Sequence, residues 1–310
     1  MENMPLPYHD YGRWMRKRFN VPVQKLAVDA GFSCPNRDGT KGLGGCVFCN
    51  NSAFSPSYCG GKSVRAQIMA GKAFFGHKYP SMKYLAYFQT YTNTYASLDV
   101  LKSLYEEALD TDCVVGLIIG TRPDCVSGEL LDYLETLSRH TFVTVEYGIE
   151  STDDRQLEWM NRGHTFECSR RMVVETAARG IVTGGHIILG LPGDTAASLV
   201  CQAEQLSALP LDILKLHQLQ VVRHTPLAAI YQRRPFPLYS VEGFVKTLGE
   251  YIQHLRPTLV LDRFVAQAPK GMVIAPQWGL KNHEFTNILV NYMRKNQISQ
   301  GQKWRPSAKG

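Results

Sequence analysis

The sequence predicts an α/β fold: a partial (β/α)6 barrel of parallel strands, followed by a C-terminal α+β appendage. Predicted strands and helices alternate six times across residues 21–225, and this alternation indicates parallel strands joined by right-handed crossovers. The chain has 310 residues, 44% of them hydrophobic, which is enough for one large α/β domain. After Thr225 the alternation is interrupted by Pro226, Pro235 and Pro237. The pattern alone leaves a doubly wound open sheet as an alternative.

The strands are predicted from apolar or alternating runs, and a continuous apolar run is typical of a parallel strand covered on both faces. In chain order they are residues 23–28, 84–89, 114–119, 142–149, 181–189 and 213–222. Apolar residues at helical spacing predict the intervening helices, which are residues 63–75, 97–109, 128–139, 153–160, 166–179 and 194–206. Ser97 and Asp194 are the expected N-caps of two of these helices.

The two ends of the chain are predicted to lie outside the barrel. Residues 1–20 form an N-terminal arm, irregular and then helical, in which Tyr8, Tyr11, Trp14 and Phe19 are interleaved with basic residues. This mixture suits stacking on nucleic-acid bases, although packing of the arm onto the domain is the favoured interpretation. The appendage, residues 226–296, is predicted to contain a helix at 241–255, a strand at 259–265 and a helix at 283–294. Residues 297–310 are expected to form a mobile basic tail.

The formal net charge is +7, which is compatible with an RNA or another polyanionic partner but does not require one. Basic residues gather near both ends of the chain: Arg13, Arg16, Lys17 and Arg18, and then Lys295, Lys303, Arg305 and Lys309. No apolar run approaches the roughly 20 residues that span a bilayer, and no apolar signal region opens the chain. We therefore expect no membrane partner and a cytoplasmic protein, whose eight cysteines are not paired in disulfides.

Three cysteines lie in the segment Cys34-Pro-Asn-Arg-Asp-Gly-Thr-Lys-Gly-Leu-Gly-Gly-Cys46-Val-Phe-Cys49, with eleven and then two residues between them. Four glycines between the first two permit the positive φ angles of a loop wrapped around a metal. Four thiolates would close a zinc site or a ferredoxin cluster, whereas three leave one position open. The spacing predicts an iron–sulfur cluster with one free iron. The alternatives are a zinc site completed by Cys59 or a histidine and, for Cys59 and Cys125, a bland role as small buried hydrophobes.

This segment resembles the cluster motif of the radical S-adenosylmethionine (SAM) superfamily, because Cys46-Val-Phe48-Cys49 has its Cys-x-aromatic-Cys ending. The first spacing is longer than the superfamily's commonest one. The resemblance implies that residues 21–225 are a radical SAM core, that Cys34, Cys46 and Cys49 hold a 4Fe-4S cluster, and that SAM binds its fourth iron. Phe48 is then expected to contact the cofactor. The chain resembles the catalytic subunit of Elongator and oxygen-independent coproporphyrinogen oxidase, and most of all the bacterial YhcC-type subfamily.

Polar residues follow the carboxyl ends of the predicted strands, which is where ligands bind in parallel barrels. Gln89, Thr90 and Asn93 occupy the place of a Gly-Gly-Glu-like segment, so the resemblance implies that they bind the SAM amino group. A Thr/Asn-rich turn is the alternative. The segment Gly120-Thr-Arg122-Pro-Asp124 resembles part of the Elongator subunit. Its arginine and aspartate are expected either to form an ion pair that shapes the loop or to contact SAM or substrate.

Two further segments resemble SAM-binding segments of these families. Glu150 ends the fourth strand and Arg162 follows one helix later, and the resemblance implies that they bind the ribose hydroxyls and the SAM carboxylate, respectively. A surface cation at a helix end is the alternative for the arginine. In Gly185-His186-Ile-Ile-Leu-Gly190-Leu-Pro-Gly193, the resemblance implies ribose contact by His186, with a satisfied core histidine as the alternative. Gly190 would let the backbone approach adenosine.

The resemblance implies reductive cleavage of SAM to a 5′-deoxyadenosyl radical, with flavodoxin or ferredoxin as the kind of electron donor expected. Likeness to the Elongator subunit, which modifies tRNA, makes tRNA the expected substrate. A radical SAM enzyme acting on a small molecule is the second hypothesis, and an iron–sulfur or zinc-binding module without radical chemistry is the third. No residue is assigned a catalytic role toward the substrate.

Overall fold

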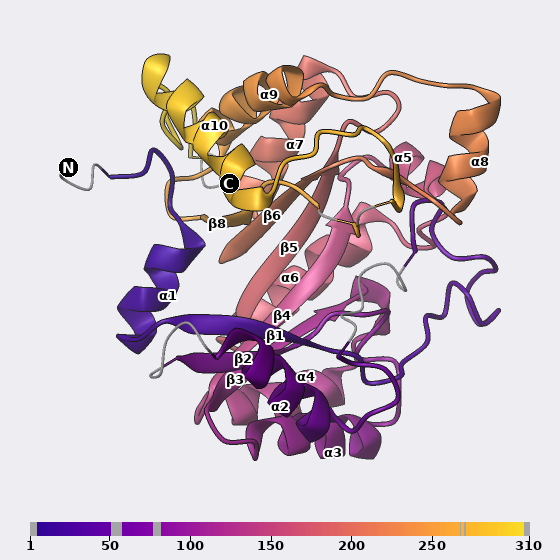
Figure 1. Ribbon diagram of the computed structural model, residues 1–310, viewed down its shortest axis with the longest axis vertical. Coiled ribbons are helices and arrows are strands. Elements are labelled where there is room, and N and C mark those ends of the chain that lie inside the picture. Colours follow the sequence, from indigo (N-terminus) through magenta and orange to yellow (C-terminus); the bar gives the residue numbers. More distant parts are fainter. Residues whose placement is uncertain (1–4, 51–57, 77–81, 267, 270, 307–310) are drawn as a thin grey trace.

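The computed structural model describes residues 5–50, 58–76, 82–266, 268–269 and 271–306. The start of the predicted arm and the end of the predicted tail, Lys309 included, lie outside these residues. Seven parallel strands form one sheet in the order β1-β2-β3-β4-β5-β6-β8. Their bounds are β1 Val23–Val28, β2 Lys83–Phe88, β3 Val114–Thr121, β4 Phe142–Glu150, β5 Val182–Leu189, β6 Ile213–Gln218 and β8 Val260–Arg263. The sheet curls into a half-barrel (Figure 1), so the predicted barrel is confirmed over the open sheet.

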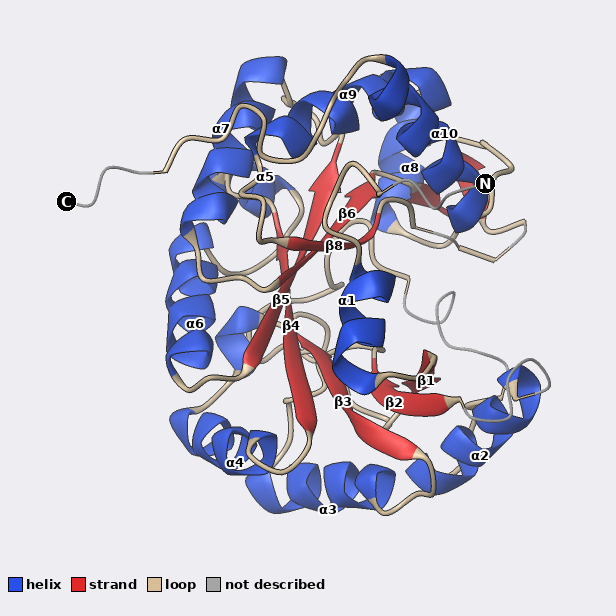
Figure 2. Ribbon diagram, turned by 90° about the vertical axis from the view of Figure 1, so that its left-hand side faces the viewer, coloured by secondary structure: helices blue, strands red, loops and turns tan. Residues whose placement is uncertain are grey.

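Helices cover the outer, convex face of the sheet (Figure 2). They are α2 Val64–Phe75, α3 Leu98–Leu109, α4 Gly128–Ser138, α6 Phe166–Ala178 and α7 Ala196–Ala208. The short helix α5, Asp154–Trp159, follows β4 and packs its Leu157 with Ile188 and Leu219. Ser63, Ser127 and Thr165 cap three of them with their hydroxyl oxygens, as expected from their residue types. Ser97 stands at the N-cap of α3, but within the described chain its hydroxyl makes no capping hydrogen bond.

The predicted N-cap role of Asp194 is wrong. The N-cap of α7 is Thr195, whose hydroxyl accepts a hydrogen bond from the Ser198 N–H while the Ser198 side chain bonds back, forming a capping box. The Asp194 carboxylate instead accepts hydrogen bonds from the N–H groups of Gly190 and Leu191, at 2.8 and 2.9 Å. It therefore closes the loop that follows β5, which removes it from the helix end.

The C-terminal part of the chain contributes to the main sheet. The predicted strand 213–222 is divided, because the chain leaves the sheet after β6 and residues Val221–Val222 form β7, which pairs antiparallel with β9 (Val273–Ala275). Strand β8, from the expected appendage, pairs with β6 as the seventh strand. The remaining helices are α8 Pro226–Arg233, α9 Val241–His254 and α10 Asn282–Lys295. Residues 297–306 fold back, since the Gln300 amide donates to the Arg256 and Leu259 carbonyls at 2.8 Å. This described part is not a free tail.

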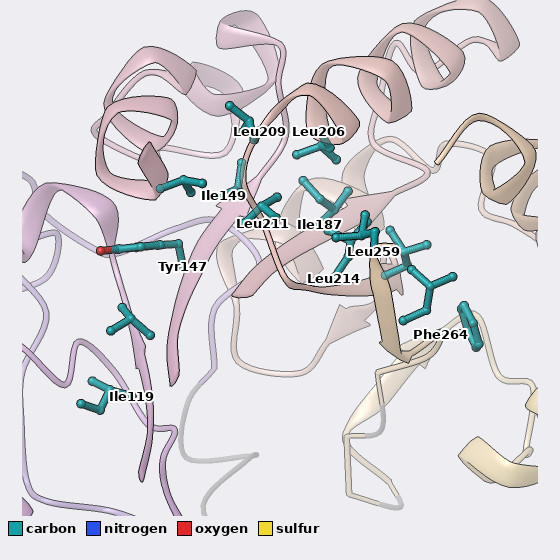
Figure 3. Close-up of a cluster of buried hydrophobic side chains, with 14 of the residues drawn as sticks. Ile119, Tyr147, Ile149, Ile187, Leu206, Leu209, Leu211, Leu214, Leu259 and Phe264 are labelled. Carbon is teal, nitrogen blue, oxygen red and sulfur yellow. The ribbon is translucent and has the colours of Figure 1, made fainter. Parts of the chain in front are cut away.

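Alternate strand residues build two layers of core. On the outer face, residues such as Tyr147, Ile149 and Ile187 pack with Leu206 and Leu211 beneath the helices (Figure 3). Inside the barrel, side chains from the beginnings of the strands form a second apolar cluster with helix α1 (Tyr11–Phe19). Because side chains alternate between the faces of a strand, every second residue points into the barrel, and polar residues at these positions approach its carboxyl end.

Helix α1 covers the amino-terminal end of the barrel (Figure 2). Tyr11 and Met15 are buried against the inner cluster, and the rings of Trp14 and Phe19 lie 6.1 and 5.6 Å from that of Phe142. The arm aromatics therefore pack onto the domain, as the favoured interpretation predicted. Within the described residues, no helix is both long and apolar enough to cross a bilayer.

Candidate functional site

A cavity of about 240 Å³ opens at the carboxyl ends of the strands. Its walls combine the cysteine loop after β1 with residues from the ends of β2 to β6 and β8. Nine of the residues predicted from the sequence line it: Cys34, Cys46, Phe48, Cys49, Gln89, Thr90, Glu150, Arg162 and His186. Two predicted residues, Asn93 and Gly190, are not among the described residues that line it.

The cysteine loop is held in place by its glycines and by one asparagine. Gly44 and Gly45 have φ angles of 79° and 77°, which residues with a Cβ rarely adopt, and a Cβ on Gly42 would lie 2.2 Å from the Asn36 side-chain oxygen. The Asn161 amide donates to the carbonyls of Leu43 and Gly45 at 3.2 and 2.9 Å. The loop is thereby fixed to the segment that follows α5.

The thiols of the loop lie in surroundings suited to a metal cluster. Cys46 is buried, while Cys34 and Cys49 are half-buried. Burial raises the pKa of Cys49 to about 11, and the neighbouring Cys46 adds to the shift, so the ionised thiolates need a positive partner such as a bound metal. Donors already face one sulfur: Arg162 Nη1 and Asn36 Nδ2 lie 3.5 and 3.7 Å from Cys46 Sγ. Hydrogen bonds of this kind orient thiolate ligands.

The zinc site completed by Cys59 does not form. Cys59 is buried away from the cavity, and its thiol donates to the Ala27 carbonyl at 3.4 Å. Cys125 is also outside the main cavity, with its sulfur 3.6 Å from Asp124 Oδ1, and burial raises its pKa to about 12. Within the described ranges, no group of three His, Cys, Asp or Glu side chains is arranged to hold a single metal ion. Three thiols on one wall fit a cluster that leaves an iron open for another ligand.

Arg162 is a buried residue of the site, 7% exposed, so the surface-cation alternative is wrong. Its Nη2 donates to the Gly148 carbonyl at 2.5 Å and lies 3.8 Å from Glu150 Oε1, while Nη1 points at Cys46. Burial lowers its pKa, but the nearby Cys46 and Glu150 outweigh burial, and the net pKa is raised. Its Nε is buried with no hydrogen-bond partner among the described residues. One donor therefore remains for a ligand.

The Arg122–Asp124 pair shapes the loop after β3, the first of the two alternatives. Arg122 Nε and Nη2 each donate to the Asp124 carboxylate at 2.9 Å. Burial raises the pKa of Asp124, but the guanidinium overrides it and holds the pKa far below its usual range. Arg122 Nη2 also donates to the Arg162 carbonyl at 2.7 Å. The pair thus supports the backbone that carries the arginine of the site.

Glu150 reaches the cavity through an unusual backbone conformation. Its φ of 68° lies in the left-handed region, and the β4–β5 register shifts between Gly148 and Glu150. Residues other than glycine adopt this region at a cost, and such positions cluster at functional sites. A Cβ on Gly148 would lie 2.6 Å from both Arg162 Nη2 and Glu150 Oε1. The glycine therefore leaves room for the two side chains that meet there.

The segment after β2 divides into lining and supporting residues. Gln89 and Thr90 line the cavity, and the Thr90 hydroxyl is buried without a partner among the described residues. Asn93 instead donates to the carbonyls of Phe88 and Gly120 at 3.0 and 2.8 Å, which joins the ends of β2 and β3.

Gly190, after β5, has a φ of 88°, and a Cβ there would lie 2.9 Å from the Tyr239 ring. Its glycine is thus explained by packing against that ring.

His186 belongs to a buried charge network that sequence reasoning missed. Its Nε2 lies 3.0 Å from Glu146 Oε2, which also accepts a 2.6 Å hydrogen bond from Lys215 Nζ. Lys215 lies 3.4 Å from Asp262, which forms a 2.5 Å pair with Lys25. Burial, with Lys215, lowers the pKa of His186, while Lys215 overrides burial to hold the pKa of Glu146 well below its usual range. His186 is therefore a neutral, partnered residue that also lines the cavity.

Comparisons with known proteins agree with this architecture. Residues 34–200 match the family described as the radical SAM superfamily, and residues 211–295 match the radical SAM C-terminal domain. The Escherichia coli K12 protein YhcC is 34% identical over 300 residues, 96% of each chain. The Bacillus subtilis protein YtqA is 32% identical over 310 residues, 97% of this chain and 96% of that protein.

More distant relatives match part of their own length. The tRNA uridine(34) acetyltransferase of Methanocaldococcus jannaschii is 23% identical over 206 residues, 66% of this chain and 37% of that protein. The solved structure of the archaeal Methanocaldococcus infernus Elp3 has a TM-score of 0.65 at 16% identity, with 90% of this chain and 64% of that chain covered. This chain thus spans less than two thirds of that structure, whose likeness shows the fold. The family match over the core and the full-length relatives show that the chain belongs to the radical SAM superfamily and is an enzyme of that class, with a 4Fe-4S cluster and SAM as its cofactors.

Proposed function

We propose that this enzyme cleaves SAM reductively and uses the resulting radical to modify tRNA. The observation that carries the SAM assignment is the position of Arg162, a buried guanidinium 3.5 Å from the Cys46 sulfur with an unpartnered Nε. A cation with a free donor beside a cluster ligand suits the carboxylate of a molecule bound to the open iron. When bound and reduced, the cluster supplies the electron that breaks the SAM carbon–sulfur bond to give methionine and a 5′-deoxyadenosyl radical.

The protein's own residues hold and orient SAM in this proposal. Cys34, Cys46 and Cys49 bind the three other irons, and Arg162 binds the carboxylate. Glu150 accepts hydrogen bonds from the ribose hydroxyls, since its carboxylate faces the cavity from the strained end of β4. We assign the amino group to the Thr90 hydroxyl, which is buried without a partner among the described residues.

The cluster assignment is tested by iron content and SAM cleavage after anaerobic reconstitution. Alanine at any of the three loop cysteines is expected to remove most of the iron and to abolish 5′-deoxyadenosine formation, with the fold retained. Cys59→Ala is the matched control, because Cys59 is buried away from the cavity and its thiol donates to the Ala27 carbonyl. Loss of iron in that control with normal iron in Cys34→Ala would contradict the assignment.

The tRNA substrate is supported by the relative named tRNA uridine(34) acetyltransferase and by the net charge of +7. Three exposed arginines also lie on the cysteine loop and on the helix that is bonded to it. Arg37 is exposed on the cysteine loop, and Arg233 and Arg234 are exposed at the end of α8, which is joined to that loop by a 2.8 Å hydrogen bond from Leu227 N–H to the Val47 carbonyl. Phosphates bound here would release counterions, so binding is expected to weaken steeply with salt.

The terminal basic residues are less well placed for this role. Arg16, Lys17 and Arg18 lie on α1, at the end of the barrel opposite the cavity (Figure 1), and Lys303 is paired with Glu250 at 2.7 Å. We therefore expect Arg233→Gln with Arg234→Gln to weaken tRNA binding and flatten its salt dependence more than neutralisation of Arg16 and Lys17. SAM cleavage without substrate is expected to stay unchanged in both variants.

The decisive experiment compares modified nucleosides in tRNA from deletion and parent cells by mass spectrometry. The proposal expects one modified nucleoside to disappear on deletion and to return when the wild-type gene, but not the Cys46→Ala gene, is supplied. Identical nucleoside profiles would reject tRNA as the substrate and favour a small molecule.

A further inference from the structure

We propose that the deep end of the cavity binds an anionic group of the substrate, a carboxylate or a phosphate, through Arg263 and His217. The proposal rests on the proposed function in one respect, namely that a substrate enters this cavity. Both residues line it, on β8 and at the end of β6. They are two strands or more from Glu150 at the end of β4, which lies 3.8 Å from Arg162, so this position is separate from the proposed SAM carboxylate site.

The charges at this end do not balance without a ligand. Three cations, Lys25, Lys215 and Arg263, share the barrel interior with two carboxylates, Glu146 and Asp262. Both carboxylates are taken, because Glu146 pairs with Lys215 at 2.6 Å and Asp262 pairs with Lys25 at 2.5 Å. Arg263 forms no ion pair with any described residue, and its Nε is buried without a partner among them. A half-buried guanidinium whose Nε is shielded from water and lacks a counter-charge is destabilising, and an anion in the cavity would compensate it.

The two histidines beside Arg263 do not supply the missing negative charge and do not add positive charge. Burial lowers the pKa of both His186 and His217, with Arg263 as a further cause for His217. Their rings stack at 5.7 Å. Both are therefore neutral near pH 7, and the surplus charge is the single guanidinium.

The contact between Arg263 and His217 fixes how the pair presents donors. Arg263 Nη2 lies 3.3 Å from His217 Nε2. A guanidinium only donates, so Nε2 must accept and the ring proton is on Nδ1. Arg263 Nε–H and His217 Nδ1–H are then two donors from neighbouring strands. Such a pair suits an oxyanion better than a neutral base edge, because one donor carries full charge.

The test measures anion binding directly on the anaerobically reconstituted enzyme, without tRNA and without turnover. Thermal unfolding is followed in chloride buffer and with added inorganic phosphate or acetate at constant ionic strength. A ligand that binds the folded state raises the midpoint in proportion to ln(1 + [L]/Kd). We expect a saturable rise in the wild type with at least one anion, and at least a tenfold weaker affinity in Arg263→Gln. The preferred anion tells a phosphate from a carboxylate source.

Arg170→Gln is the matched control, since Arg170 is exposed and pairs only with Glu167 among the described ion pairs. It should keep the wild-type response. In chloride alone, Arg263→Gln is expected to unfold at the same temperature as the wild type or higher, because it removes a half-buried charge that no described carboxylate compensates. If Arg263 served only to stabilise the fold, Arg263→Gln would have a lower midpoint of thermal unfolding than the wild type. His217→Phe, which removes the second donor, provides the affinity test if Arg263→Gln does not fold.

Three results would overturn the inference: no specific response in the wild type, an undiminished response in both variants, or loss of SAM binding together with anion binding in Arg263→Gln. The last would place the anion site within the SAM site. Failure of the tRNA proposal is distinguishable, because it appears as unchanged nucleosides while anion binding persists.

Discussion

Substitution of Gly148 by alanine is expected to perturb the proposed SAM site from the backbone of β4. The new Cβ would lie 2.6 Å from Arg162 Nη2 and from Glu150 Oε1, and real Cβ contacts essentially never fall under 3.0 Å. Each side-chain end must therefore move by at least about 0.4 Å, the difference of these two distances. Such a movement shifts the guanidinium, which is held by a 2.5 Å hydrogen bond to the Gly148 carbonyl, away from the position in which it is proposed to bind SAM. The obstructing atoms are side-chain ends, so the strand itself is expected to persist.

The expected loss of SAM affinity is that of the one hydrogen bond which the displaced Arg162 guanidinium no longer makes to the SAM carboxylate. Loss of one hydrogen bond to a charged group costs about 1.5–3 kcal/mol. Since about 1.4 kcal/mol is tenfold in an equilibrium constant, SAM affinity should fall about 10- to 140-fold. Iron content should not change, because none of the three cysteines is moved by the new methyl group.

Equilibrium dialysis of SAM with the reconstituted enzyme measures this effect. The control is Gly128→Ala, because a Cβ at Gly128 meets nothing within 4 Å and the residue is the first of α4. That variant should bind SAM normally. If Gly148→Ala bound SAM within twofold of the wild type, the position of Arg162 would not matter for SAM, and its proposed role would be refuted.

Three further predictions concern single groups. Arg162→Ala should weaken SAM binding by about 1.5–3 kcal/mol with unchanged iron, as dialysis will show; unaltered affinity would remove the carboxylate role. Asp124→Ala leaves the buried Arg122 unpaired and should lower the unfolding free energy by about 3–5 kcal/mol in urea titrations, whereas Arg155→Ala, which breaks an exposed pair with Asp153, should lower it far less. Because the folded state lowers the pKa of His217, this residue binds a proton only in the unfolded protein as the pH falls below about 6.5. The unfolding free energy should therefore be lower by about 1.4 kcal/mol at about pH 5.5. His217→Phe should reduce this dependence on pH, and an identical pH profile in the variant would contradict the prediction.

Elements with long periodic patterns were predicted to within one or two residues, as α2 and β4 illustrate. The errors arose where two principles competed. Pro226 predicts an interruption, yet proline is also favoured at the first position of a helix, and Thr225 caps α8 directly before it. The continuous apolar run 213–222 predicts one strand, although the chain leaves the sheet to pair with β9. Pairing partners so distant in sequence cannot be inferred from a local pattern.

The site was predictable where a motif marked it and unpredictable where the barrel assembles it. The cysteine loop and Arg162 were found through resemblance. Glu146 and Lys215 were missed, although each stands at an inward position of an apolar strand, and charged residues are almost never fully buried unless paired. That signal identifies a buried charge but not its partner. The partner depends on the curl of the sheet, which brings residues of β4, β6 and β8 together.

The position of α1 has a consequence for the order of events during turnover. With Tyr11 and Met15 buried at one end of the barrel, and Lys25 on β1 paired with Asp262 on β8, molecules exchange with the interior through the opposite mouth. In the proposed reaction, methionine and 5′-deoxyadenosine would then leave by the route through which the substrate enters. A substrate as large as tRNA, lying across that mouth, would block it. Binding and release would then be ordered: SAM would bind before the substrate, and the two products of SAM would leave only after the modified substrate.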